Sequence, residues 1–332
     1  MSDANTRQYL LHKLALYGAG KGVLNDHSAY VIKDAAPLQV NTNLVRLFPS
    51  SVHKFDQEGN LPLHMAAASA NVSMAQLLGD RFPSGATVRN EDGLLPVHLA
   101  ILACASPLTS GYGNADNARE MVQTILGYFS GAIAVTDNDG NLPIHTAATV
   151  LRGEVGVDVI FMLYDEARRQ LKDPFGARFK NKLKLEDLGN MSMGTQDTAT
   201  PTVSSNNFDE CLQCTLVKND LGWTPLFCAI HSCAKWEVID ALVQGPHGDK
   251  AALETDEDGN NALHLLLDER YLDPTSALSV LKAAPESACA RNIDGMLPIE
   301  VRSHIDVAFS QFSNSFLSTL FSWRACTAFT SS

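Results

Sequence analysis

The sequence contains no run of about 18 apolar residues, the length that a transmembrane helix needs, so we expect no membrane span. Its first residues, MSDANTRQYL, lack the basic and apolar regions of a signal peptide. Seven cysteines, an odd number scattered over 332 residues, do not resemble a disulfide framework. A reducing compartment fits them better, and we predict a cytoplasmic or nuclear protein.

Basic residues are also scarce. The chain has 25 Lys and Arg against 37 Asp and Glu, which leaves a net charge of −12. Because a phosphate backbone repels an acidic surface, we expect no general nucleic-acid binding. The composition is otherwise that of a globular protein, with 45% hydrophobic residues to build a core.

No nucleophile stands in a recognisable Ser/His/Asp or Cys/His arrangement, so we expect no enzyme, no catalytic residues and no cofactor. The segment GAGKG, which begins at Gly18, lacks the spacing of a phosphate-binding loop. Carboxylates are abundant, but most of them belong to a turn phrase that recurs along the chain.

This phrase occurs six times. Its glycines lie at 59, 93, 140, 222, 259 and 295, so successive copies are 34, 47, 82, 37 and 36 residues apart. Three of these intervals are close to one period, and the other two exceed it as insertions would. The copies read DQEGNLPLHMA, NEDGLLPVHLA, DNDGNLPIHTA, NDLGWTPLFCA, DEDGNNALHLL and NIDGMLPIEVR.

Each residue type in the phrase has a physical role. An Asp or Asn bonds its own backbone, and the Gly that follows accepts a positive φ, so the two together predict a turn. A Pro three residues later suits the first turn of a helix, where its missing N–H costs nothing. A second apolar pattern follows, and then a short extended stretch such as SVHKF, GATVR or AIAVT leads into the next turn.

The repeated phrase resembles the signature D-x-x-G-x-T-P-L-H-x-A of the ankyrin family, and the likeness spans roughly residues 52–302. The resemblance implies an all-α solenoid of stacked ankyrin repeats, each a helix-turn-helix with a short β-hairpin loop. Leucine replaces the helix-capping Thr in most copies, which predicts a looser helix start there. The departures from the signature are Leu61, Leu95, Leu142 and Leu297 for Thr, Phe227 and Glu300 for His, and Ala262 for Pro, while Thr224 is retained.

Three regions are predicted along the chain. Residues 6–55 form a degenerate N-terminal capping repeat, with YLLHKLALY as its first helix. Residues 56–302 form the array of six units, with polar Glu300 and Arg302 in the half-exposed last one. Residues 303–332 form a C-terminal capping helix and tail, in which aromatic and apolar residues recur at helical spacing. A helix that binds a membrane surface or a partner is the alternative for this last region.

Two insertions interrupt the array, one near residues 103–117 and one near 172–214. The first lengthens the turn between two helices. The second has a polar, Ser/Thr-rich middle without periodicity, which predicts a disordered segment. Seven basic residues from Arg168 to Lys184 overlap its start and are interpreted as a solvated continuation of the preceding helix, with a nuclear-import or acidic-partner patch as the alternative.

Two groups of residues raise the question of a metal. His64, His98, His145 and His264 share one repeat position, but helices of neighbouring repeats pack about 8–10 Å apart, too far to share one zinc ion. The resemblance implies instead that each braces neighbouring backbone, so we predict no metal site. The segment Cys211–Cys233 contains a C-x-x-C, further cysteines and His231, and the rival hypothesis is a metal- or redox-sensing regulator.

The predicted function is that of a non-enzymatic scaffold or adaptor. The resemblance implies that a protein partner contacts the hairpin turns and the exposed side of each first helix. This surface is acidic with a few apolar anchors, chiefly Trp223, so the hypothesis is an unidentified partner with basic residues and one apolar group. The predicted partner-binding residues are Gln57, Glu58, Asn60, Glu91, Asp92, Leu94, Asn138, Asp139, Asn141, Asp220, Leu221, Trp223, His231, Glu257, Asp258, Asn260, Asp268 and Glu269.

Overall fold

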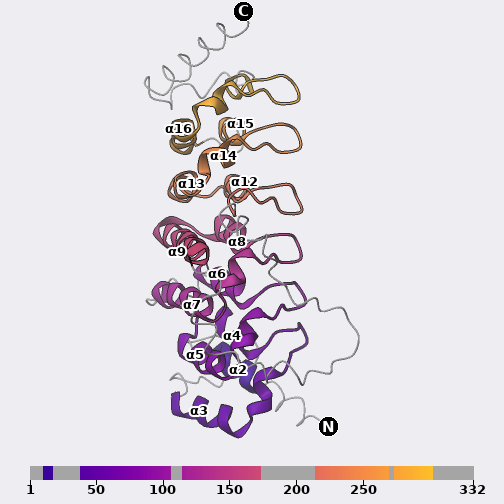
Figure 1. Cartoon of the computed structure of the whole chain (residues 1–332), viewed down its shortest axis with the longest axis vertical. Coiled ribbons are helices and arrows are strands. Elements are labelled where there is room, and N and C mark those ends of the chain that lie inside the picture. The colour runs from indigo at the N-terminus through magenta and orange to yellow at the C-terminus, as the bar shows by residue number, and fades with distance from the viewer. Residues whose placement is uncertain (1–9, 18–37, 106–113, 173–213, 269–272, 302–332) are drawn as a thin grey trace, which may run out of the picture. The chain divides into compact units, whose positions relative to one another are not determined.

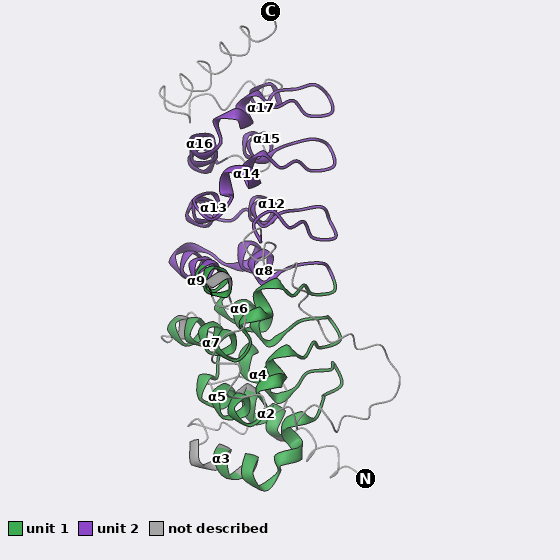
Figure 2. Cartoon of the chain, viewed as in Figure 1, with its two compact units in different colours: residues 1–138, 165–211 green, residues 139–164, 212–332 purple. Residues whose placement is uncertain are grey.

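The computed structural model describes residues 10–17, 38–105, 114–172, 214–268 and 273–301. Two compact units make up the chain (Figure 2). Unit 1 comprises residues 1–138 and 165–211, and unit 2 comprises residues 139–164 and 212–332. Each unit is an all-α stack of helix pairs (Figure 1).

Unit 1 contains two rows of helices. The first row is α2 (Leu10–Tyr17), α4 (Pro62–Ala68) and α6 (Pro96–Ala105), in which α4 packs against both neighbours. The second row is α3 (Leu38–Leu47), α5 (Val72–Arg81) and α7 (Asn114–Tyr128), in which α5 occupies the central place. Each helix of the first row also packs on the helix of the second row that follows it in the chain.

Unit 2 repeats this arrangement. Its first row is α8 (Pro143–Val150), α12 (Pro225–His231), α15 (Ala262–Leu267) and α17 (Pro298–Val301). Its second row contains α13 (Trp236–Val243) and α16 (Pro274–Ala283), which pack on each other, and the beginning of α9 (Gly153–Lys172). A short additional helix, α14 (Gly248–Leu253), follows α13 and packs against both α13 and α16.

The core lies between the rows and consists largely of small and branched side chains. Ala66, Ala100, Ala147 and Ala229 share one repeat position, two residues after the conserved place of the histidine in the phrase, and each is fully buried. A methyl side chain there lets neighbouring helices of the first row approach closely. Larger side chains fill the space beside them, and each helix buries its apolar face against the next repeat.

The segments predicted to be extended before each turn are short 3-10 helices instead. They are η1 (Pro49–His53), η2 (Pro83–Thr87), η3 (Ser130–Ala134) and η5 (Pro285–Cys289). The cause is local, because these segments close bonds three residues apart, such as Gly85 N–H to the Phe82 carbonyl at 2.9 Å. The residue that follows each of these 3-10 helices is extended. Across the described part of the chain the only bridge is the isolated pair Thr255–Asn261.

The helix starts show why leucine can replace threonine. Leu61, Leu95 and Leu142 are buried, so each adds apolar contact at the site where a hydroxyl would cap the helix. The N–H of each donates instead to Nδ1 of the histidine three residues later, at 3.1 Å in all three cases. These starts are therefore bonded, although the missing hydroxyl predicted looser ones. Side-chain caps come from Thr224 and from Asn261, which the phrase did not identify as a cap.

The first insertion is shorter as a loop than predicted, since α6 continues to Ala105 and α7 begins at Asn114. Residues 106–113 between them lie outside the described residues. So do residues 173–213 of the second insertion, residues 18–37 of the predicted capping repeat, and the predicted C-terminal helix and tail at 303–332. Of the basic segment, Arg168 and Arg169 lie on α9 and pair with Asp165 and Glu166.

Candidate functional site

The candidate site is built on the six turns, which we call tips 1 to 6, each counted as five residues from its Asp or Asn. Tip 1 shows the geometry: Asp56 Oδ1 accepts from the N–H of Glu58 at 3.0 Å and of Asn60 at 2.7 Å. The fourth position is always Gly, with φ between +73° and +75°. The residues at positions two and three of every tip are exposed. The tips are Asp56–Asn60, Asn90–Leu94, Asp137–Asn141, Asn219–Trp223, Asp256–Asn260 and Asn292–Met296.

Asparagine pairs join the tips two by two. Odd-numbered tips begin with Asp and end with Asn, whereas even-numbered tips begin with Asn and end with Leu, Trp or Met. The terminal Asn of an odd tip accepts a hydrogen bond from the first Asn of the next even tip. The three Nδ2-to-Oδ1 distances are 3.0 Å for Asn90–Asn60, 2.8 Å for Asn219–Asn141 and 3.0 Å for Asn292–Asn260.

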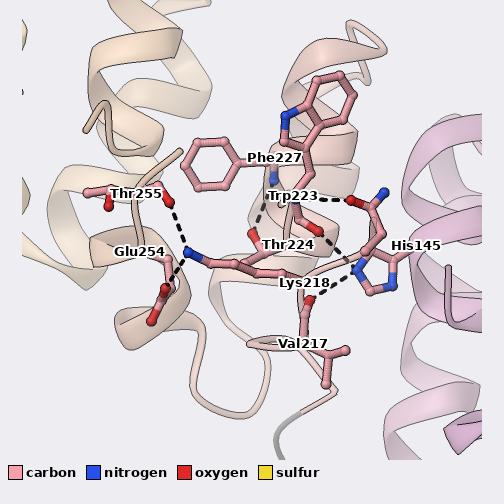
Figure 3. A network of polar contacts seen from close by, with 9 residues as sticks. His145, Val217, Lys218, Trp223, Thr224, Phe227, Glu254 and Thr255 are labelled. Carbon is pink, nitrogen blue, oxygen red and sulfur yellow. Dashed lines mark hydrogen bonds and ion pairs between the residues drawn. The ribbon is translucent and has the colours of Figure 1, made fainter. Parts of the chain in front are cut away.

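The repeated histidines brace the tips from behind. His64 Nε2 donates to the Val88 carbonyl at 3.0 Å and lies 3.3 Å from the Leu94 carbonyl, while Nδ1 accepts from Leu61. Burial lowers the pKa of His64 to about 4, so the ring is neutral at pH 7. Both of its nitrogens are engaged, which leaves no lone pair for a metal. His145 makes the same pair of contacts with Val217 and Trp223 (Figure 3).

Lysine 218 connects tip 4 to the segment that precedes tip 5. Its Nζ lies 3.1 Å from Glu254 Oε2 and donates to the Thr255 carbonyl at 2.9 Å (Figure 3). The ammonium group is exposed, so the ion pair contributes little stability by itself. Its role is geometric, since it fixes the distance between the bases of two neighbouring tips.

Most of the predicted partner-binding residues lie at the surface. Glu269 lies outside the described residues. Asn60 is only 4% exposed, and its amide is bonded to Asp56, Glu58 and Asn90, so it supports the tip from within. The exposed ones are Gln57, Glu58, Glu91, Asp92, Asn138, Asp139, Asp220, Leu221, Glu257 and Asp258, and the half-buried ones are Leu94, Asn141, Trp223, His231, Asn260 and Asp268.

Trp223 and His231 come together at one end of α12. Their rings stack with centroids 4.1 Å apart and planes 14° from parallel. The Trp223 N–H is held by Asn219 Oδ1 at 3.0 Å and its carbonyl by His145, so the backbone that carries the indole is fixed on both sides. The two residues, eight apart in the sequence, therefore form one aromatic platform, which the sequence suggested only as two separate contacts.

The described part of the cysteine-rich segment holds no assembled metal site. Among the described residues, no group of three or more His, Cys, Asp or Glu is placed to hold an ion, and Cys211 lies outside them. Cys214 and Cys228 are buried. Burial raises the pKa of the Cys228 thiol to about 11, so at pH 7 it lacks the thiolate character that redox chemistry requires.

Sequence reasoning missed the pairing of the asparagines and the contacts of Lys218. A signal for the pairs was present, because Asp in the first position always goes with Asn in the fifth, and Asn in the first position goes with a larger apolar residue in the fifth. Lys218 had no such signal, since only the folded chain brings it to Glu254.

Helix pairs that stack in rows and present tips along one edge define the class of helical repeat proteins. The family model described as ankyrin repeats (many copies) matches residues 44–100. The fold is similar to that of the ankyrin repeat domain of Bcl-3, a member of the IkappaB protein family. The TM-score is 0.51 at 15% identity, over 93% of this chain and 96% of that one. The fold is therefore that of an ankyrin-repeat solenoid, and the ankyrin family model matches one part of the chain.

No curated protein matches the sequence. No helix in the described ranges is long and apolar enough to cross a membrane.

Proposed function

We propose that the protein is a non-enzymatic scaffold or adaptor that binds a basic protein partner on its tips and on the exposed ends of its first-row helices. The ankyrin-repeat fold supports a protein-interaction domain. The observation that carries the finer proposal is the row of exposed carboxylates on the tips of unit 2. Asp220, Glu257, Asp258 and Asp294 are all exposed, and none forms an ion pair with another described residue.

Charge complementarity explains why this surface selects a basic partner. Unpaired carboxylates attract lysine and arginine side chains and steer their approach, an effect that salt screens. The platform of Trp223 and His231 supplies the apolar contact, and half-buried aromatic residues on a rigid backbone are typical interface anchors. The protein itself is expected in the cytoplasm or nucleus, and imaging of the tagged endogenous protein would test this.

The test begins with affinity capture by the tagged full chain and mass spectrometry of what it retains. The captured protein is then titrated against the double variant Trp223→Ala, Glu257→Lys. We expect at least a tenfold loss of affinity, and we expect the wild-type association rate to fall as salt is added. Trp236→Ala is the control, because Trp236 is a tryptophan at the surface of unit 2 that begins a second-row helix and lies on no tip. Equal affinity of the double variant and the wild type would refute the proposed surface.

The rival function, metal or redox sensing at Cys211–Cys233, draws no support from the buried, protonated Cys228. Its own test is metal analysis of protein purified without added zinc, for which we expect no stoichiometric metal.

A further inference from the structure

Hydrogen bonds between successive tips form a ladder that is broken at one place. The N–H at position two of a tip donates to the carbonyl at position three of the preceding tip. The four bonds of this kind are Glu91 to Glu58 at 3.1 Å, Asn138 to Asp92 at 3.2 Å, Asp220 to Asp139 at 3.1 Å, and Ile293 to Asp258 at 3.0 Å.

Between tips 4 and 5 the equivalent bond would join Glu257 N–H to the Leu221 carbonyl. Neither group has a hydrogen-bond partner within the described residues.

The space around the glycine at position four of a tip shows how close the next tip comes. A Cβ built on Gly59, Gly93, Gly140 or Gly259 would lie 2.7–3.0 Å from the backbone nitrogen of the following tip. A Cβ on Gly222, in tip 4, would meet nothing within 4 Å. Gly295 is equally open, but it belongs to the last tip. The junction between tips 4 and 5 is therefore an opening in the ladder of unit 2.

Features of the chain around this junction hold tips 4 and 5 apart. The helix α14 leads into tip 5, whereas 3-10 helices precede tips 1, 2, 3 and 6. No asparagine pair can form here, because tip 4 ends in Trp223 and tip 5 begins with Asp256. The junction of tips 2 and 3 also lacks a pair but keeps its ladder bond, so the missing pair does not by itself open a junction. Lys218 spans the base of the junction to Glu254 and Thr255, so the bases are held while the tips stay apart (Figure 3).

The residues around the opening define what would fit it. Asp220 on one side and Glu257 and Asp258 on the other are exposed carboxylates without an ion pair in the described structure. Leu221 is an exposed apolar side chain, with 59% of its surface accessible. The unbonded Glu257 N–H and Leu221 carbonyl are one backbone donor and one acceptor, the groups that an added extended segment satisfies.

We propose that the junction of tips 4 and 5 is a docking site for an extended segment of a partner protein that carries a Lys or Arg next to an apolar residue. The segment's carbonyl accepts from Glu257 N–H and its N–H donates to the Leu221 carbonyl. Its basic side chain lies between Asp220 and Glu257, and its apolar side chain covers Leu221. This inference rests on the proposed function and assigns one place on that surface to one kind of ligand.

The test uses a displayed library of random dodecapeptides selected on the full chain. We expect enriched peptides to carry a basic residue beside an apolar one. A fluorescent copy of the leading peptide is then titrated against Gly222→Asn and Gly295→Asn. The two glycines have φ of +74° and +75° and equal space for a side chain, and Asn tolerates this conformation, so the variants share the same backbone strain.

Only Gly222→Asn places its side chain in the opening. We expect it to weaken peptide binding at least tenfold, while Gly295→Asn stays within twofold of the wild type and both variants unfold at the same temperature. Equal binding by the two variants, or selection of acidic peptides or of none, would overturn the inference. If the wild type self-associated and Gly222→Asn alone did not, a second copy of the chain would be the occupant of the opening. That result would also overturn the inference.

The proposed function is judged separately. If the Trp223→Ala, Glu257→Lys variant loses the captured partner while Gly222→Asn retains both partner and peptide, the tip surface binds proteins but the opening does not. If neither variant affects the partner, both proposals fail.

Discussion

At the scale of single residues, the buried histidines tie the stability of the fold to pH. Burial holds the pKa of His64 at about 4, against an ordinary value of 6.5 in the unfolded chain. Above pH 6.5 the ring is neutral in both states, so its bonds to neighbouring backbone are fully present. As pH falls from 6.5 towards 4, the unfolded chain takes up a proton that the folded chain refuses, and stability is lost.

For His64 alone we expect the free energy of unfolding to fall by about 2 kcal/mol between pH 7 and pH 5. Burial lowers the pKa of His264 as well, so its contribution has the same sign. Urea unfolding of the wild type and of His64→Gln at both pH values measures the difference. The variant should be less stable at pH 7 but should lose less on acidification. An unchanged pH dependence in the variant would contradict the role assigned to His64.

The asparagine pairs can be tested by a double-mutant cycle. Asn260→Ala leaves the Nδ2 group of Asn292 without its acceptor, and we expect a loss of about 1–2 kcal/mol in the free energy of unfolding. The change in the free energy of unfolding of the double variant of Asn260 and Asn292 should differ from the sum of the two single changes by a coupling energy of about 1 kcal/mol. Asn260 with Asn219 is the control, because these two residues belong to different pairs and share no hydrogen bond in the described structure, so their effects should add.

Residue types in the phrase predicted the turns because an Asx side chain and a positive-φ glycine act within five residues. The same reasoning placed Asn60 at the partner surface, and the structure finds it inside the tip. The difference arises because its amide has three neighbours to bond, one of which, Asn90, belongs to the next repeat. A contact of this kind is visible in a sequence only as a correlation between repeats.

At the scale of elements, two glycines in second-row helices have opposite roles. A Cβ on Gly79 in α5 would lie 2.4 Å from the ring of Tyr128 in α7, so only glycine lets the two helices pack there. Tyr128 is held in place by its hydroxyl, which donates to Asp80 Oδ1 at 2.9 Å. A Cβ on Gly127 in α7 meets nothing within 4 Å.

We therefore expect Gly79→Ala to destabilise the protein by about 1–3 kcal/mol, because the clash outweighs the better helix propensity of alanine. Gly127→Ala should stabilise it by about 0.5 kcal/mol, since that variant gains propensity without a clash. Thermal and urea unfolding of the two variants in parallel give the comparison. Stabilisation by both substitutions would show that α5 and α7 are not packed as described.

The rows of helices and the residues at which the helices begin could be predicted from the sequence, because proline and apolar periodicity act locally. The 3-10 helices and the additional helix α14 did not, because short runs such as Ser130–Ala134 carry no strong preference for one backbone conformation. The sequence also could not show how the leucines at the helix starts compensate for the absent hydroxyl. They do so through their burial and through the bond from their N–H to histidine.

At the scale of the whole molecule, periodicity predicted the repeat class, because each repeat needs only its neighbours to bury its apolar faces. Periodicity cannot show where neighbouring repeats separate. The interval from Gly222 to Gly259 is 37 residues and that from Gly259 to Gly295 is 36, yet only the first of these junctions is open. The difference lies in long-range contacts: Lys218 and α14 at one junction, and the Asn260–Asn292 pair at the other.

Hydrogen exchange can locate the opening in solution without any ligand. The Glu91, Asn138, Asp220 and Ile293 amides each donate to the preceding tip, whereas the Glu257 amide has no such acceptor. We expect the Glu257 amide to exchange at least tenfold faster than those four, after correction for the intrinsic rate of each residue. Nuclear magnetic resonance resolves the individual amides. If the Glu257 amide were as slow as that of Asp220, the two tips would close in solution and the docking site would not exist. If it were fast alone and slowed when the selected peptide bound, the backbone donor at this junction would be the one that the ligand uses.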